Sequence, residues 1–399
     1  MVKRHGGWKT LHAFLPQFLN LRFLFFLVFL FCILSPASAE SPFSGFNPAT
    51  LLKESRGVFV ECKTLWANNA FPLRAIFFDE GWNGPFDPQD TNTMDIYWNI
   101  ETGLIYQGWR IAGFSRGELF IDANKDTVEI LRLIQLRENL PVGKKFDIDL
   151  KADGGFSVIG VEISKGINLN SIIKNLTTGI TVRYIRGEKI QEGKMQGNVI
   201  PTGPKTYAFD LYLDYLYDHN YVYERNDTNA GSGEGYSFDL GLKYLFNKNI
   251  SAEILFRDIL GRIYWKRVPY TKAYATSDVL DFDENGYQIF RPTIHGFEGY
   301  KDFTQKILFK TDLSLSYRNG RFMLAPTINF IESRQPLYWI NANFQARKDL
   351  YIDTSFNFNY KTFSIGLVHK FVTFNIYSND ISLNKVKAIG GTVRLQYSW

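Results

Sequence analysis

Cysteine is almost absent from this chain of 399 residues, which contains only Cys32 and Cys62. Cys32 lies in the N-terminal apolar run, so Cys62 is left without a partner for an intrachain disulfide in the rest of the chain. Histidine is also scarce, and His219, His295 and His369, which follow residue 40, show no metal-ligand spacing. We therefore expect no disulfide framework, no metal and no cofactor.

Long apolar runs are absent after the first 39 residues. Those 39 residues begin with basic side chains, continue through LRFLFFLVFLFCIL and end on Ala37-Ser38-Ala39. A basic start, an apolar run and a small-x-small ending are typical of a secretory signal peptide. We expect residues 1–39 to be this signal, cleaved after Ala39, and no membrane-spanning helix beyond it.

Neither sign of charge dominates. The chain has 45 Lys and Arg against 40 Asp and Glu. Residues 1–39 hold four of the basic side chains and no acidic one, which leaves 41 basic against 40 acidic. No basic patch stands out in the sequence, so nucleic acid is not an expected partner.

Aromatic residues are abundant, at 16%, and from about residue 94 they recur in alternating segments of roughly ten residues. In 205–217, apolar residues from Tyr207 to Tyr217 alternate with polar ones such as Asp210. In 304–317, Lys310 and Asp312 oppose a face of apolar residues, and 350–361 places Asp353 in the same way. This period of two predicts a series of β-strands.

The connections between these segments are of two kinds. Asn319-Gly320 predicts a type I′ hairpin turn, and 247–249 and 360–362 are also short. The stretches 218–234 and 271–286 are predicted as long polar loops. Short turns at one rim and long loops at the other are typical of outer-membrane barrels.

Three stretches are predicted to be helical. Pro48 begins a short helix that runs to Lys53. Residues 126–139 begin with Asp-x-x-Glu, which resembles a capping box, and residues 167–176 form another short helix. The two later helices are expected in a barrel lumen or over its rim.

A soluble sandwich also alternates, with its apolar face inside, whereas a membrane barrel has its apolar face outside. Charges in mid-strand, such as Asp210, Lys310, Asp312 and Asp353, favour the barrel because a lumen tolerates them. We expect an all-β, transmembrane, up-and-down antiparallel β-barrel of about 14 strands, with 16 as the next alternative. Residues 91–399 form the barrel, and 40–90 supply a plug-like N-terminal segment and first strands.

The chain ends on GGTVRLQYSW, in which Val393, Leu395, Tyr397 and Trp399 alternate with polar residues. A terminal strand with an aromatic last residue resembles the insertion signal of outer-membrane barrels. It implies the bacterial outer membrane, with the lipid and the assembly machinery of that membrane as partners.

Candidate enzymatic and metal motifs are weaker. A lipid-cleaving barrel needs a hydroxyl nucleophile beside a histidine, and neither His219 nor His369 is followed by a nearby serine. Residues 281–286 match the start of a calcium loop, but position 12 of that loop is Pro292 where a glutamate is required. We therefore expect a protein that is not an enzyme.

Three pieces of the sequence resemble the FadL-like superfamily of outer-membrane barrels, which includes relatives of the PorV kind. These are Asn47-Pro48-Ala49, the strand pair within 233–265 that contains Asp239-Leu240-Gly241 and Arg257-Asp258, and residues 179–190. The family has glycine where this chain has Thr50. The resemblance implies a 14-stranded barrel with an N-terminal plug that changes conformation to pass hydrophobic molecules.

We expect a transporter or channel for small hydrophobic compounds, or alternatively a structural or secretion-associated barrel without a transport role. The residues expected in the lumen or plug are Asn47, Pro48, Asp210, Arg257, Asp258, Lys310, Asp312 and Asp353. No catalytic, cofactor or metal residue is expected.

Overall fold

The computed structural model describes residues 43–53, 56–219, 231–282 and 288–399. The strands are β1 (Gly57–Asn68), β2 (Thr91–Tyr106), β3 (Trp109–Asn124), β4 (Phe146–Asn168), β5 (Leu176–Gly203), β6 (Thr206–Tyr217), β7 (Gly233–Leu245), β8 (Ile250–Phe282), β9 (Gln288–Lys306), β10 (Lys310–Asn319), β11 (Phe322–Ile331), β12 (Leu337–Arg347), β13 (Leu350–Asn357), β14 (Thr362–His369), β15 (Val372–Ser378) and β16 (Ala388–Ser398). The helices are η1 (Pro48–Lys53), η2 (Leu73–Ile76), η3 (Asp79–Asn83) and α3 (Lys125–Gln135).

All neighbouring strands are antiparallel, and the sheet closes because β1 pairs with both β2 and β16. Two positions in the ring are each shared by two strands. β7 and then β6 pair with successive parts of β5, and β10 and then β9 pair with successive parts of β8. The ring therefore has 14 positions built from 16 strands, which confirms the predicted barrel and its strand number.

The wall is apolar outside and polar inside. On β1, Val58 and Val60 are 47% and 44% exposed, whereas Glu61 and Lys63, which follow on the opposite face, are 7% and 4% exposed. The same contrast recurs around the ring, where isoleucine, leucine and aromatic side chains form the exposed outer face. A soluble sheet has the opposite polarity, so this pattern is that of a wall surrounded by hydrocarbon.

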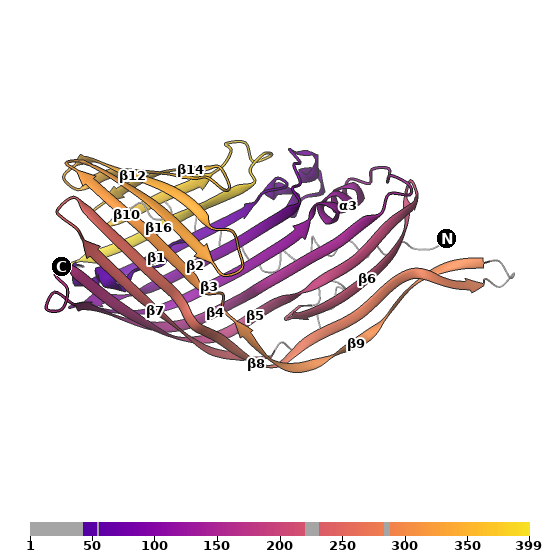
Figure 1. Cartoon of the computed structure of the whole chain (residues 1–399), viewed down its shortest axis with the longest axis horizontal. Helices are drawn as coiled ribbons and strands as arrows, with labels where there is room; N and C mark the ends of the chain where they lie inside the picture. The colour runs from indigo at the N-terminus through magenta and orange to yellow at the C-terminus, as the bar shows by residue number, and fades with distance from the viewer. Residues whose placement is uncertain (1–42, 54–55, 220–230, 283–287) are drawn as a thin grey trace.

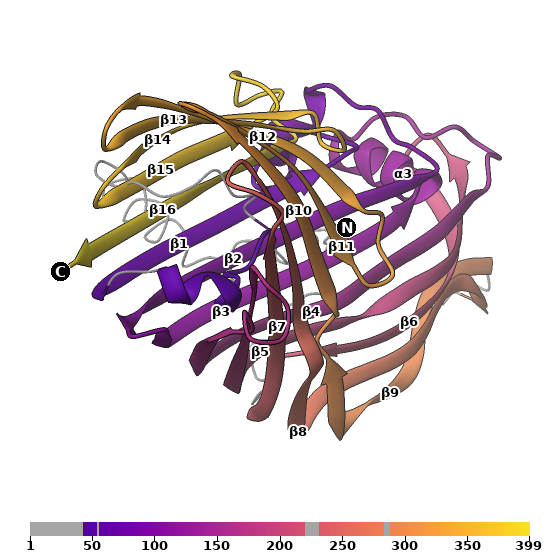
Figure 2. The ribbon, with the colours of Figure 1, turned by 60° about the vertical axis from the view of Figure 1, so that its left-hand side comes forward.

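The wall is much taller on one side. β4, β5, β8 and β9 contain 23, 28, 33 and 19 residues, while β10 to β16 contain 7 to 11. Figures 1 and 2 show the long strands extending together beyond the ends of the short ones, to the right in Figure 1. On β5 the exposed apolar belt ends at Tyr184, so the section Gln191–Gly203 lies beyond it. We name this section, with β6 and the upper parts of β8 and β9, the raised wall.

The helix α3 differs in detail from its prediction. It begins after Asn124, whose side chain caps the Thr127 N–H, so Asp126 is not the N-cap. Val128 and Leu131 pack with Trp66 and Leu119, which face outward. The helix therefore covers the outer face of the wall beside the rim, and not the lumen.

Two other predictions were wrong. Residues 169–175 form a turn where a helix was predicted, because Asn168 and Asn170 accept backbone N–H groups of Asn170 and Asn175. Residues 271–282, predicted as loop, continue β8 through pairs such as Tyr274 with His295. The calcium-like motif 281–286 and the loop 218–234 lie largely outside the described residues.

The hairpin between β10 and β11 also differs. Asn319 pairs with Phe322, so the two turn residues are Gly320 and Arg321. Only Gly320 has a positive φ, of 56°, which is the pattern of a type II′ turn and not of type I′. Among the described residues, no helix is long and apolar enough to cross a membrane.

Candidate lumen plug and the charged network around it

Residues 43–53, the plug segment, lie inside the barrel. Asn47 caps η1, because its Oδ1 accepts the Ala49 N–H at 3.0 Å and its carbonyl accepts the Thr50 N–H at 3.0 Å. Pro48 at the first helical position needs no N–H partner there. Thr50, where the resembling family has glycine, also donates its hydroxyl to the Asn47 carbonyl at 2.8 Å.

The plug segment docks where the wall has glycines. A Cβ on Gly241 would lie 2.0 Å from Oδ1 of Asn47, and a Cβ on Gly179 would lie 2.4 Å from the carbonyl carbon of Pro48. Side chains at these two positions would collide with η1. The three sequence pieces that resemble the FadL-like barrels therefore meet at one contact, between Asn47-Pro48-Ala49 and the strands that carry Gly179 and Gly241.

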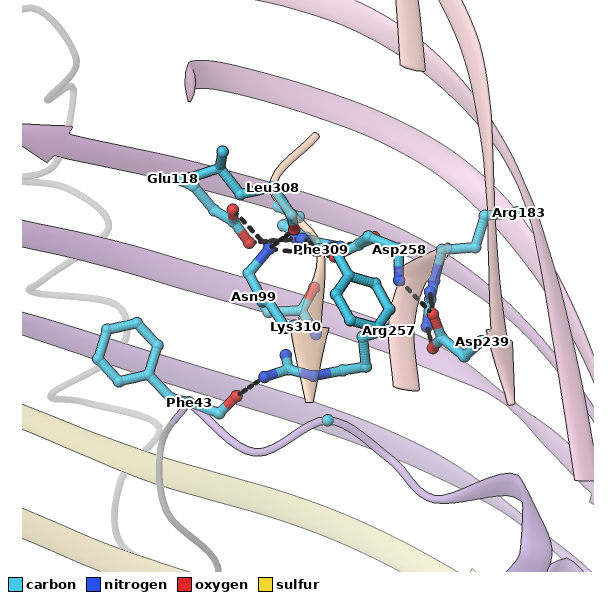
Figure 3. A network of polar contacts seen from close by, with 12 residues as sticks. Phe43, Asn99, Glu118, Arg183, Asp239, Arg257, Asp258, Leu308, Phe309 and Lys310 are labelled. Atoms are coloured by element: carbon cyan, nitrogen blue, oxygen red, sulfur yellow. Dashed lines mark hydrogen bonds and ion pairs between the residues drawn. The ribbon is translucent and has the colours of Figure 1, made fainter. Parts of the chain in front are cut away.

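Polar side chains of the wall bind the plug segment. Asn47 donates to Oε2 of Glu253 at 3.1 Å, and Lys63 donates to the Ser44 carbonyl at 3.1 Å. Arg257 donates to the Phe43 carbonyl (Figure 3). Arg257 also forms an ion pair with Asp312 at 3.0 Å. Asp312 in turn accepts the Gly45 N–H at 3.1 Å. The wall thus binds the backbone of residues 43–45 and the side chain of Asn47.

A cluster of buried charged side chains, the charged cluster, spans the lumen near the plug segment and contains Arg116, Glu118, Asp258 and Lys310. Arg116 of β3 forms a two-pronged pair with Asp258 of β8, at 2.9 and 2.6 Å. Lys310 of β10 bridges Asp258, at 3.1 Å, and Glu118 of β3, at 2.9 Å (Figure 3). These four side chains are at most 8% exposed. They join β3 to β8 and β10, which are not neighbours of β3 in the ring, so they span the lumen at this level.

The charged cluster continues along the inner wall. The Asp258 N–H donates to Asp239 at 3.0 Å, and Asp239 pairs with Arg183 at 2.6 Å. Arg183 pairs with Glu162 at 2.7 Å, and Glu162 pairs with Arg110, which also binds Glu101. Each buried charge therefore has an opposite partner, as burial requires.

An apolar cluster lies at the loop side of the plug segment. Phe43 is fully buried there, with its ring centroid 5.5 Å from that of Tyr97. Trp339 and Tyr377 meet edge to face at 6.0 Å in the same cluster. Inside a polar lumen, this is a surface on which an apolar molecule is stabilised by burial.

A cavity of about 790 Å³ lies on the other side of the plug segment, toward the short turns. Its lining includes Ser44, Asn47 and Thr50 of the plug segment and side chains of β10, β11 and β16. From the turn end, the lumen therefore contains a polar cavity, then the plug segment and charged cluster, and then the apolar cluster.

Glu192 is a titratable group within the raised wall. Gln305 donates to its carboxylate at 3.0 Å and also receives the Trp265 N–H at 3.0 Å. Burial raises the pKa of Glu192 to about 7. Because the folded state prefers the protonated acid, this group's stabilising contribution is complete below about pH 4.5 and is lost as the pH rises through 7.

The residues proposed from the sequence are not all together. Asn47 and Pro48 are in the plug segment, and Arg257, Asp258, Lys310 and Asp312 surround it or lie in the charged cluster. Asp353 is buried on β13 beside Asn343, away from both groups. Asp210 is exposed on the inner face of the raised wall, far beyond the plug segment. Trp399, Tyr397 and Leu395 are exposed on the outer face, and Val393 is half-buried.

Sequence reasoning missed Phe43, Arg110, Arg116, Glu118, Glu162, Arg183 and Asp239. The signal was present for several of them. In WRIAGFSRGEL, residues 109–119, Arg110, Arg116 and Glu118 occupy one face and Trp109 and Ile111 the other. Alternation of this kind predicts the inward face, but it does not say which inward charges meet across the lumen.

Comparison with known proteins gives matches among solved structures only. No family model matches the sequence, and no curated protein matches it. The chain is similar to the toluene transporter TodX of Pseudomonas putida, at 11% identity and a TM-score of 0.44, over 88% of this chain and 92% of that one.

Two further matches are similar in quality. A TodX mutant described as a monoaromatic hydrocarbon channel matches at 10% identity and a TM-score of 0.46, over 88% of this chain and 93% of that one. A FadL homologue of Pseudomonas aeruginosa matches at 10% and 0.38, over 91% and 95%. Because these values are low, we infer the function below from this chain's own residues.

Proposed function

We propose that this protein is an outer-membrane channel for small hydrophobic compounds, plugged in the conformation described, and that it is not an enzyme. The single observation that carries the proposal is the contact between the plug segment and the apolar cluster. Phe43 lies among Tyr97, Trp339 and Tyr377, so displacement of the plug segment would free an aromatic-lined site inside the barrel. An apolar ligand gains about 25 cal/mol for each Å² that it buries in such a site.

The membrane is proposed as the bacterial outer membrane, with the short turns toward the periplasm. The exposed apolar belt, the closed sheet and the predicted signal peptide support this location. The terminal aromatic residues Tyr397 and Trp399 remain proposed as the signal that the assembly machinery reads.

Toluene is a suitable test compound, because it is the compound named for the matched transporter TodX. We expect cells that express the chain to take up radiolabelled toluene faster than cells without it. Trp339→Gln introduces a polar group into the apolar cluster and should lower this uptake severalfold. Trp82→Gln is the matched control, because both indole nitrogens are buried without a hydrogen-bond partner among the described residues, and Trp82 packs on the outer face.

Uptake equal to that of cells without the protein would contradict the proposal. An equal loss in both variants would show that the apolar cluster has no special part in passage.

A structural or secretion-associated barrel is the second candidate. The observation that favours it is the charged cluster, in which Arg116, Asp258, Lys310 and Glu118 join opposite parts of the wall. A permanently closed barrel would give no toluene uptake in any variant, and a gentle pull-down would recover partner proteins.

A further inference from the structure

We infer that the cavity at the turn end is a binding site for a small organic anion, recognised through a carboxylate or phosphate group. The cavity of about 790 Å³ is lined by seven Lys and Arg side chains and by three acidic ones. The chain after residue 39, with this lining included, is nearly neutral, at 41 basic against 40 acidic residues. This end of the lumen therefore concentrates positive charge.

The three acidic lining residues do not neutralise the positive charge of the cavity. Glu253 is already bound by Lys243 and by Asn47, and Asp312 is bound by Arg257. Only Asp349, on the turn before β13, is left. Six basic lining residues have no ion-pair partner among the described residues: Lys53, Lys248, Arg318, Lys348, Lys370 and Arg394.

One of these cations is partly buried and unsatisfied. The Nε atom of Arg394 is buried and has no hydrogen-bond partner within the described part of the chain. The Arg394 guanidinium lies over the Phe59 ring, at 5.7 Å from its centroid. An N–H that is buried without a partner costs free energy, which an anionic acceptor in the cavity would recover.

The shape of the site selects a small molecule. A concave space with low-dielectric walls concentrates the field of its charges, so an anion is attracted more strongly than it is at a flat surface. The volume is in the range of about 300–1,000 Å³ that small-molecule sites occupy. Arg318 of β10, Arg394 of β16, and Lys348 and Lys370 in the turns after β12 and β14 all line this space, so an anionic group inside it meets several cations.

The inference is tested by titration calorimetry on the purified full chain in a neutral detergent. The ligands are octyl phosphate, inorganic phosphate and octyl glucoside, each titrated separately. We expect octyl phosphate to bind and octyl glucoside not to bind. Binding of inorganic phosphate as well would show that the free anion suffices, and its failure to bind would show that an amphiphile is required.

The variants separate this site from general surface charge. Lys348→Gln with Lys370→Gln should weaken octyl phosphate binding at least fivefold. Lys361→Gln with Lys385→Gln removes two exposed lysines at the loop end and should leave it unchanged. Equal binding of octyl glucoside, an equal effect of both variant pairs, or no anion binding at all would overturn the inference. None of these outcomes depends on toluene uptake, so the two proposals fail separately.

Discussion

Gly241→Ala should release the plug segment without disturbing the barrel. The new Cβ would lie 2.0 Å from Oδ1 of Asn47 and 2.9 Å from Cδ of Pro48, so η1 has to move away from β7. The wall itself has no need to move, because the collision involves only atoms of the plug segment. Gly113→Ala is the matched control, since its Cβ meets nothing closer than the Gly160 carbonyl at 3.9 Å.

The size of the effect follows from the contacts of Asn47. Its movement loses the cap of η1, which is worth about 1 kcal/mol. It also loses the hydrogen bond to the Glu253 carboxylate, which is worth about 1.5–3 kcal/mol because the acceptor is charged. Gly241→Ala should therefore destabilise the docked state relative to the released state by about 2.5–4 kcal/mol. The population of the released state should then rise roughly 60- to 700-fold.

Thiol labelling measures this population. Ser44 is buried in the lumen, so Ser44→Cys in a Cys62→Ser background should react slowly with a membrane-impermeant maleimide. Gly241→Ala should raise the labelling rate by a factor in the range given above, and Gly113→Ala should not change it. A labelling rate unaffected by Gly241→Ala, in a barrel that still resists detergent unfolding, would refute the docking contact.

Three further predictions concern stability, pH and assembly. Lys310→Met should lower the free energy of unfolding by about 3–5 kcal/mol in urea titrations, because it leaves two buried acids, Glu118 and Asp258, to share Arg116. Adding Glu118→Gln should recover part of this loss, and an unchanged midpoint would contradict the role of the cluster. Glu192→Gln should stabilise the protein at pH 8 on the order of 2 kcal/mol and have little effect at pH 4.5, so equal effects at both pH values would contradict the raised pKa. Deletion of Trp399 should reduce the amount of heat-modifiable barrel in the outer membrane, and normal assembly would show that this residue is not the signal.

The alternation of polar and apolar residues predicted most of the β-strands. It separates the two faces of β13, and the polar residues Asp353, Ser355 and Asn357 on one of them are all buried. It failed at 307–309, between β9 and β10, where the chain leaves the sheet. In the segment 304–317, alternation puts Ile307 on the apolar face and Lys306 on the polar face with Lys310, yet Ile307 is 1% exposed inside the barrel and Lys306 is on the outer face. A break of this kind exchanges the inward and outward positions that follow it, and the amino-acid composition of the segment does not indicate where the break occurs.

The capped helix of the plug segment could be predicted from the sequence, but the ion pairs of the charged cluster could not. Asn47-Pro48 predicts a capped helix because Asn can cap a helix and Pro is favoured at its first position, and the structure has that helix. Arg116 and Asp258 are 142 positions apart, and their pairing depends on the closure and diameter of the ring. The sharing of one ring position by β6 and β7 is equally non-local, since each pairs with a different part of β5.

The most direct measurement of the central claim is toluene uptake into liposomes that contain either the whole protein or a variant lacking residues 43–53. The account predicts that the deletion leaves the barrel folded and raises the rate of uptake, because the apolar cluster is no longer occupied by Phe43. A folded variant that takes up toluene no faster than the whole protein would contradict the claim that this segment is the plug of a hydrophobic channel.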